Sequence, residues 1–314
     1  MDLEVEIGGR NNIDSFATLL AMAPFLDERL LLSEQPCLSN KSAAVKSSPA
    51  SWTAADFADE SAYTYTLSDI ETAEVNEAIA YFIAAGFGID QVTPRTFPLP
   101  TLGEALRDFA IELHEGRGLF VLRGLEPDRY TIEENTVIFL GISCYVGGVL
   151  GKQTDDGKIR RRISSTETRP LFFHRDGNLI SSVLPDALVE SPDVKRQAGL
   201  PSLTPIQIKA LNAIQSLSRK HCVSLPMLKG DILFVNNLSL LHAREAFADS
   251  TVNKRYLVRL WLKNEEMAWK LPGVLKRGNE DLYSNTVDGD EEERDWNIIP
   301  EPGFRFWVYE RQTP

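Results

Sequence analysis

One histidine and two arginines near the C-terminal end of the chain have the types and spacing that suit a metal ion beside an anionic ligand. They lie in KGDILFVNNLSLLHAREAFADSTVNKRYLVRLWL, residues 229–262. The pattern predicts a Gly-Asp turn, a buried strand, a connection that carries His242, and a second strand over 255–262. Strand side chains alternate with a period of two, so Arg255 and Arg259 leave the same face of that strand. An alternative stays open, in which His242 is a hydrogen-bonded core residue and the arginines are surface charges.

A second candidate pair, His174 and Asp176, lies in RPLFFHRDGNLI. On a strand, an imidazole and a carboxylate two residues apart project to one side. Together with a remote histidine, here His242, they would supply the two-His-one-carboxylate set of non-haem iron(II) oxygenases. Asp176 and Gly177 also form a dipeptide typical of tight hairpin turns. A hairpin without a metal role is therefore the alternative.

The order GDILFVNNLSLLH, a loop, and RYLVRLWL resembles the C-terminal half of the taurine dioxygenase-like (TauD/TfdA) oxygenases, in particular their fungal branch. The resemblance implies an α+β fold, with a double-stranded β-helix (jelly-roll) core and flanking helices. It implies Fe(II) as the metal and 2-oxoglutarate as cosubstrate. By position, the resemblance assigns iron to His174, Asp176 and His242. It also assigns the distal carboxylate of 2-oxoglutarate to Arg255, and an acidic group of the substrate to Arg259.

The chain departs from this family in one place. The interval from His174 to His242 is 242 − 174 = 68 residues, shorter than is usual in the family. Relatives also carry a segment similar to residues 169–180 downstream of their H-x-D motif. Two interpretations therefore stay open. The iron site is complete, or an internal deletion has removed the true H-x-D and left a non-catalytic protein that binds small molecules or has a structural role.

Composition limits the classes of partner. The 314 residues are 43% hydrophobic and 25% charged, which is ordinary for a globular chain. The net charge of −12 and the pI of about 4.9 argue against nucleic-acid and anionic-membrane partners, which need clustered Lys and Arg. A small-molecule substrate remains, and no pattern indicates an oligomeric state. Three separated cysteines without a C-x-x-C motif predict reduced thiols in a cytoplasmic protein.

The chain divides in sequence into an N-terminal part, 1–51, and an oxygenase-like domain, 52–314, whose core spans about 100–265. We expect a helix over residues 13–32 and a Ser- and Ala-rich linker before residue 52. The chemistry-bearing segments follow a buried strand over 119–123. His114 is expected to be structural, because no H-E-x-x-H motif follows it.

Four S/T-x-x-E/Q patterns predict helix starts with reciprocal capping. The pairs are Ser68 with Glu71, Thr101 with Glu104, Thr131 with Glu134, and Thr204 with Gln207.

Overall fold

The structure, a computed structural model, describes residues 3–9, 14–18, 49, 52–151, 172–175, 178–181, 202–244 and 256–283. Its helices are α1 (Asp69–Ala84), α2 (Leu102–Glu115), α3 (Ile132–Val146), α5 (Pro205–His221) and α6 (Gly273–Tyr283). Its strands are β1 (Leu3–Gly9), β2 (Asp14–Thr18), β3 (Thr64–Thr66), β4 (Leu119–Arg123), β5 (Val149–Leu150), β6 (Phe172–Arg175), β7 (Asn178–Ser181), β8 (Val223–Met227), β9 (Ile232–Asn236), β10 (Ala243–Arg244) and β11 (Tyr256–Lys263). The first two strands and the β6–β7 pair are described by their backbone pairing.

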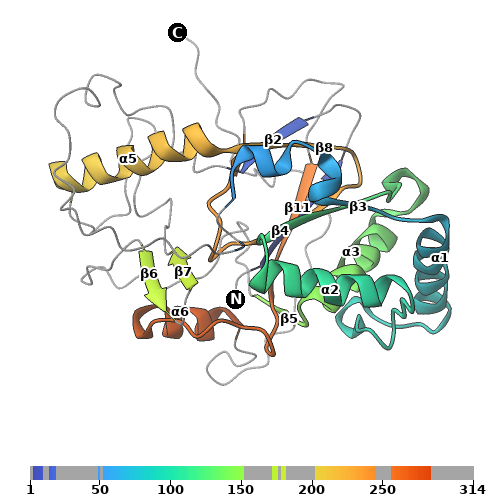
Figure 1. Cartoon of the computed structure of the whole chain (residues 1–314). Helices are drawn as coiled ribbons and strands as arrows, with labels where there is room; N and C mark the ends of the chain where they lie inside the picture. The colour runs from blue at the N-terminus through green and yellow to red at the C-terminus, as the bar shows by residue number, and fades with distance from the viewer. Residues whose placement is uncertain are drawn as a thin grey trace, which may run out of the picture.

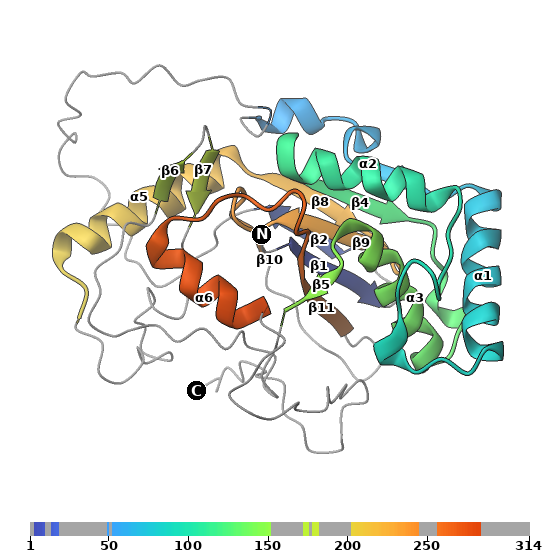
Figure 2. The same ribbon diagram turned by 90° about the horizontal axis from the view of Figure 1, so that it is seen from below.

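The strands form three sheets. The largest has the order β3-β4-β9-β1-β11-β5, the second β10-β2-β8, and the third β6-β7. β3 and β4 pair in parallel, and the remaining pairs are antiparallel. Helices α1, α2 and α3 gather on one side of the molecule, whereas α5 and α6 lie on the other (Figures 1 and 2). This mixture of helices and sheets agrees with the predicted α+β class.

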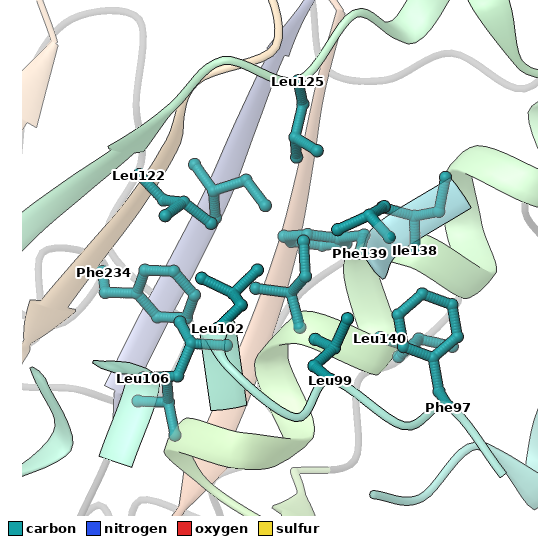
Figure 3. Close-up of a cluster of buried hydrophobic side chains, with 14 of the residues drawn as sticks. Phe97, Leu99, Leu102, Leu106, Leu122, Leu125, Ile138, Phe139, Leu140 and Phe234 are labelled. Atoms are coloured by element: carbon teal, nitrogen blue, oxygen red, sulfur yellow. The ribbon is translucent and has the colours of Figure 1, made fainter. Parts of the chain in front are cut away.

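One face of the six-stranded sheet is covered by α1, α2 and α3. Alternate strand residues, including Leu122 and Phe234, join leucines of α2 and the apolar side chains of α3 in one buried cluster (Figure 3). Phe120 belongs to the same cluster. The rings of Phe120 and Phe234 stack with centroids 4.5 Å apart. The apolar stripe of α2 is thereby explained, because it packs on this face.

The other face of the six-stranded sheet packs against the three-stranded sheet. A second buried cluster joins β4 and β9 to β8. Its strand residues are Leu119, Val121, Val223, Leu225, Met227, Leu233 and Val235. Leu225 is 0% exposed. The two sheets therefore enclose an apolar layer between them, and we call this layer of seven residues the apolar half of the inter-sheet space.

Three of the four predicted capping boxes are confirmed. Ser68, Thr131 and Thr204 each cap their helix through the residue three positions on. Thr101 makes no side-chain cap. Instead the Glu74 carboxylate of α1 accepts hydrogen bonds from the backbone amides of Thr101 and Leu102. The prediction failed here because a residue remote in sequence satisfies the free amides of α2.

The N-terminal segment differs from the predicted helix over residues 13–32. Residues 14–18 form β2, which lies between β10 and β8, and β1 lies between β9 and β11. The helix prediction is thus wrong for 14–18. Because both strands pair with strands of the expected oxygenase-like domain, the division at residue 51 does not separate them from its sheets. The remainder of that domain division stays a prediction.

Candidate functional site

The predicted Gly-Asp turn fixes the start of β9. Gly230 has a φ of 86°, and a side chain there would meet the Leu125 carbonyl oxygen at 2.2 Å from its Cβ. Asp231 is buried, and its Oδ2 accepts from the Leu228 amide at 2.7 Å and from Arg123 Nη2 at 2.8 Å. The pKa of the Arg123 guanidinium is raised, chiefly by its hydrogen bonds to Asp231. This paired charge ties the β8–β9 turn to the end of β4.

Asn236 fixes the other end of β9. Its buried amide Nδ2 donates to the Leu113 carbonyl at 2.9 Å, and its Oδ1 accepts from the Leu238 amide at 3.1 Å. Leu238 is buried in the cluster between the six-stranded sheet and helices α1, α2 and α3, which we call the helix-covered cluster. Leu240 is buried in the second cluster, beside the seven residues of the apolar half. The connection from β9 to His242 is therefore held by one polar and two apolar anchors.

His242 is half-buried and immediately precedes β10. In the three-stranded sheet, Arg244 pairs with Phe16, which pairs with Leu225 of β8. Leu225 faces the six-stranded sheet as part of the apolar half. His242 itself precedes β10, so the register places its backbone at the end of the strand that pairs with β2.

Arg259 lies on β11 and is half-buried. Its neighbours Leu260 and Leu262 belong to the helix-covered cluster. Arg259 and Trp261, at alternate positions, therefore lie on the opposite face of the six-stranded sheet, the face that packs on β8 at β4 and β9. Both His242 and Arg259 also interact with other parts of the chain.

Across this inner face, the residue types change from strand to strand. One row runs Val121, Leu233, Glu6 and Arg259, in the order of register partners. The next row runs Leu119, Val235, Glu4 and Trp261. We call the positions Glu4, Glu6, Arg259 and Trp261, with His242 on the facing sheet, the charged half of the inter-sheet space. β1 thus places two acidic positions beside the candidate arginine.

His174 lies on one strand of the antiparallel β6–β7 pair. β6 and β7 are antiparallel, with Arg175 opposite Asn178, so residues 176 and 177 alone separate the paired positions. This is the hairpin that the Asp-Gly dipeptide predicts. The two strands pair with each other and, within the described ranges, not with β10 or β11. His174 lies on β6, while Asp176 falls outside the described residues.

The proposed iron ligands are not tested as a set. Arg255, like Asp176, lies outside the described residues, and only the backbone of His174 is described. In the part of the chain that the structure describes, no three His, Cys, Asp or Glu side chains gather as a metal site would require. The assignment of iron, 2-oxoglutarate and substrate to these residues stays a prediction.

Two other titratable side chains, His114 and Cys144, lie in surroundings that fit a structural role. His114 is buried at the end of α2, where its Nδ1 lies 2.5 Å from the Ala110 carbonyl oxygen, and burial lowers its pKa. Burial raises the pKa of the Cys144 thiol to about 12. The structural interpretation of His114 agrees with these surroundings. Over the described ranges, no helix has the length and apolar character to cross a membrane.

Sequence reasoning missed three residues that shape this region. Asp231 and Asn236 stand at the two ends of the buried strand, where a polar residue next to an apolar run signals an anchor. Trp261 is two positions from Arg259, so strand alternation already assigns both residues to one face. The insertion of β1 carried no local signal, since its partners lie more than two hundred residues away.

Comparison with known sequences adds two matches. Residues 153–261 match the family described as "Taurine catabolism dioxygenase TauD, TfdA family". The chain is also 29% identical to the "Taurine hydroxylase-like protein SAT17" of Stachybotrys chartarum (strain CBS 109288 / IBT 7711), in an alignment that covers 80% of this chain and 88% of that protein.

The alignment with the fungal protein is longer than the part of this chain that it includes. It is 339 positions long and includes 80% of the chain's 314 residues, or about 251. About 339 − 251 = 88 positions of that protein therefore have no counterpart in this chain. A shortfall of this size is expected if the chain lacks an internal stretch that its relative has.

Two solved structures show a looser similarity. The non-heme iron oxygenase OrfP matches with a TM-score of 0.46 and 16% identity, over 69% of this chain and 96% of its own. An asparagine oxygenase in complex with Fe(II), 3-hydroxyasparagine and succinate matches with a TM-score of 0.44 and 14% identity, over 64% and 93%. The sequence matches bear out the predicted resemblance: residues 153–261 are similar to the taurine dioxygenase-like (TauD/TfdA) family.

Proposed function

We propose that the protein is an Fe(II)- and 2-oxoglutarate-dependent oxygenase that oxidises a C–H bond of a small acidic molecule. The observation that carries the proposal is the family match over residues 153–261, which includes His242 and Arg259. The six- and three-stranded sheets, packed face to face, would be the two halves of a double-stranded β-helix. The protein would act in the cytoplasm.

His174, Asp176 and His242 are the proposed iron ligands. Two imidazoles and one carboxylate are the donor set that suits iron(II) with open positions. The half-buried His242 fits such a role. When bound, iron(II) and 2-oxoglutarate supply the oxidising chemistry, in which 2-oxoglutarate and oxygen yield succinate, CO2 and the oxidised substrate.

Two arginines would hold the organic acids. Arg255 would bind the distal carboxylate of 2-oxoglutarate through two parallel N–H donors, which a guanidinium offers and an ammonium does not. Arg259 would meet the acidic group of the substrate in the charged half. We propose an amino acid or a sulfonic acid as that substrate, since Arg259 is half-buried and offers a single guanidinium to one acidic group.

An anaerobic binding experiment tests the iron site. Iron(II) and 2-oxoglutarate, mixed with the native protein without oxygen, should give a weak visible charge-transfer band, which His242→Ala should abolish. His221→Ala is the matched control, because His221 ends α5 and is exposed. No band with the native protein, or equal bands in both variants, would contradict the proposal.

A non-catalytic protein that keeps the oxygenase frame is the second candidate. The β6–β7 hairpin at His174 and Asp176, and the roughly 88 positions missing against the fungal relative, favour it. Sequencing the transcript across codons 158–169 discriminates between the candidates. A further exon that encodes another H-x-D would restore the oxygenase in a longer chain. If the transcript matches the chain and the purified protein binds no iron, the non-catalytic candidate stands.

A further inference from the structure

Trp261 carries a buried hydrogen-bond donor that the protein leaves unused. The residue is 7% exposed, and its indole Nε1 has no hydrogen-bond partner among the residues that the structure describes. Two other tryptophans do not share this property. Trp52 Nε1 donates to the Arg117 carbonyl at 3.0 Å, and Trp269 Nε1 donates to the His114 carbonyl at 3.1 Å. A buried indole N–H ordinarily finds a partner, because leaving it unsatisfied destabilises the fold.

The position of Trp261 indicates where that partner would come from. Trp261 follows Arg259 by two residues, so both lie on the inner face of the six-stranded sheet. Adjacent positions on one face of a strand are about 6.6 Å apart, from a rise of about 3.3 Å per residue. A small molecule held by Arg259 is therefore within reach of the Trp261 indole.

Other unpartnered buried polar atoms lie elsewhere. His114 Nε2 and Ser143 Oγ are on helices, and Thr64 Oγ1 is on β3, at the far edge of the sheet from β11. Among these atoms of the described chain, Trp261 Nε1 is the one that shares a strand and a face with Arg259. That coincidence links the unused donor to the candidate substrate site.

We propose that Trp261 Nε1 donates a hydrogen bond to an acid oxygen of the substrate that Arg259 binds. The inference rests on the proposed function and names Trp261 as a residue that determines substrate specificity. The substrate class is a small amino sulfonate or amino carboxylate. Such an anion has more acceptor positions than one guanidinium fills, and it satisfies the indole N–H on binding.

The indole N–H signal of Trp261 tests the inference directly. In ¹⁵N-labelled protein loaded with iron(II) and 2-oxoglutarate without oxygen, this signal is identified by its loss in Trp261→Phe. On addition of taurine or β-alanine it should move downfield, as a new hydrogen bond requires. The Trp269 signal should stay in place, because its donor is already bonded to His114. Ethanolamine, which lacks the acid group, should move neither signal.

Affinity gives a second measurement. Trp261→Phe keeps the ring but removes the donor, and should weaken the binding of taurine or β-alanine about tenfold, as for a hydrogen bond to a charged group. Trp269→Phe, the matched control, should change that affinity less than about twofold. If the charge-transfer band forms but neither acid moves the Trp261 signal, the inference is overturned and the proposed function stands. A moving signal without any band would support the inference, while the oxygenase proposal would fail.

Discussion

The apolar half and the charged half of the inter-sheet space lie on the same sheets but have opposite composition. Strands β4, β8 and β9 fill the apolar half with seven buried aliphatic and methionine side chains. Strands β1 and β11 bring Glu4, Glu6, Arg259 and Trp261 to the charged half. Apolar burial stabilises a fold in proportion to the area removed from water, whereas charges between sheets stabilise it only when they are paired.

The difference suggests separate tasks for the two halves. The unpartnered indole donor of Trp261 does not stabilise the fold, whereas the buried valine and leucine side chains of β4 and β9 do. Residues that are unfavourable for stability gather where a ligand binds, because the ligand supplies the missing partners. The apolar half would hold the two sheets together, and the charged half would bind the small molecule.

The largest expected effect concerns stability and tests this separation. Leu225→Ala removes a fully buried side chain of the apolar half and should lower the free energy of unfolding by about 2–5 kcal/mol. Arg259→Ala in the charged half should lower it by less than about 1 kcal/mol, as for a partly exposed charge. Urea denaturation measures both, with the exposed neighbour Ser224→Ala as control. Similar losses for Leu225→Ala and Arg259→Ala would show that both halves are structural.

The sequence predicted those features of both halves that depend on local patterns. The strand over 119–123, the buried strand after Gly230 and the strand with Arg259 were each found from local apolar runs between turn residues. Three helix starts were found from capping pairs that span only four residues. Such features are local, so a single sequence contains them.

The remaining features depend on contacts remote in sequence. The β2 segment was taken for helix because its apolar residues also suit a helix, and pairing with β8 and β10 decides in favour of a strand. Glu74 replaced the predicted cap of Thr101 in the same way. The acidic positions of β1 reach Arg259 only through the pairing of β1 with β11. Neither local periodicity nor motif spacing contains that information.

The second largest expected effect distinguishes the role of Arg255 from that of Arg259. Arg255→Lys should raise the concentration of 2-oxoglutarate needed for turnover roughly ten- to a hundredfold, which corresponds to about 1.5–3 kcal/mol for a charge-assisted contact. Arg259→Lys should weaken coupling to the substrate and leave substrate-independent decay of 2-oxoglutarate nearly intact. Succinate formed at increasing 2-oxoglutarate concentration measures both variants. Small and equal effects would mean that both arginines are surface charges, and the assigned roles would be wrong.

The smallest expected effect concerns Glu6, the register partner of Arg259. Opposite charges at facing positions of an antiparallel pair stabilise each other by about 0.2–1 kcal/mol. From this register we expect an acidic ligand to compete with Glu6 for the guanidinium, so Glu6→Gln should strengthen the binding of taurine or β-alanine by up to about fivefold. Calorimetric titration of the iron(II)- and 2-oxoglutarate-loaded protein without oxygen measures this gain.

Glu4→Gln is the matched control for Glu6→Gln. It removes the same charge from the same strand, two positions away, but its register partner is Trp261 rather than an arginine. A general loss of negative charge would strengthen binding equally in both variants, whereas local competition requires the larger gain in Glu6→Gln. The gain should also shrink as salt rises, because screening weakens the competing pair. Unchanged affinity in Glu6→Gln would mean that Glu6 does not compete for Arg259, and that β1 contributes pairing alone to the charged half.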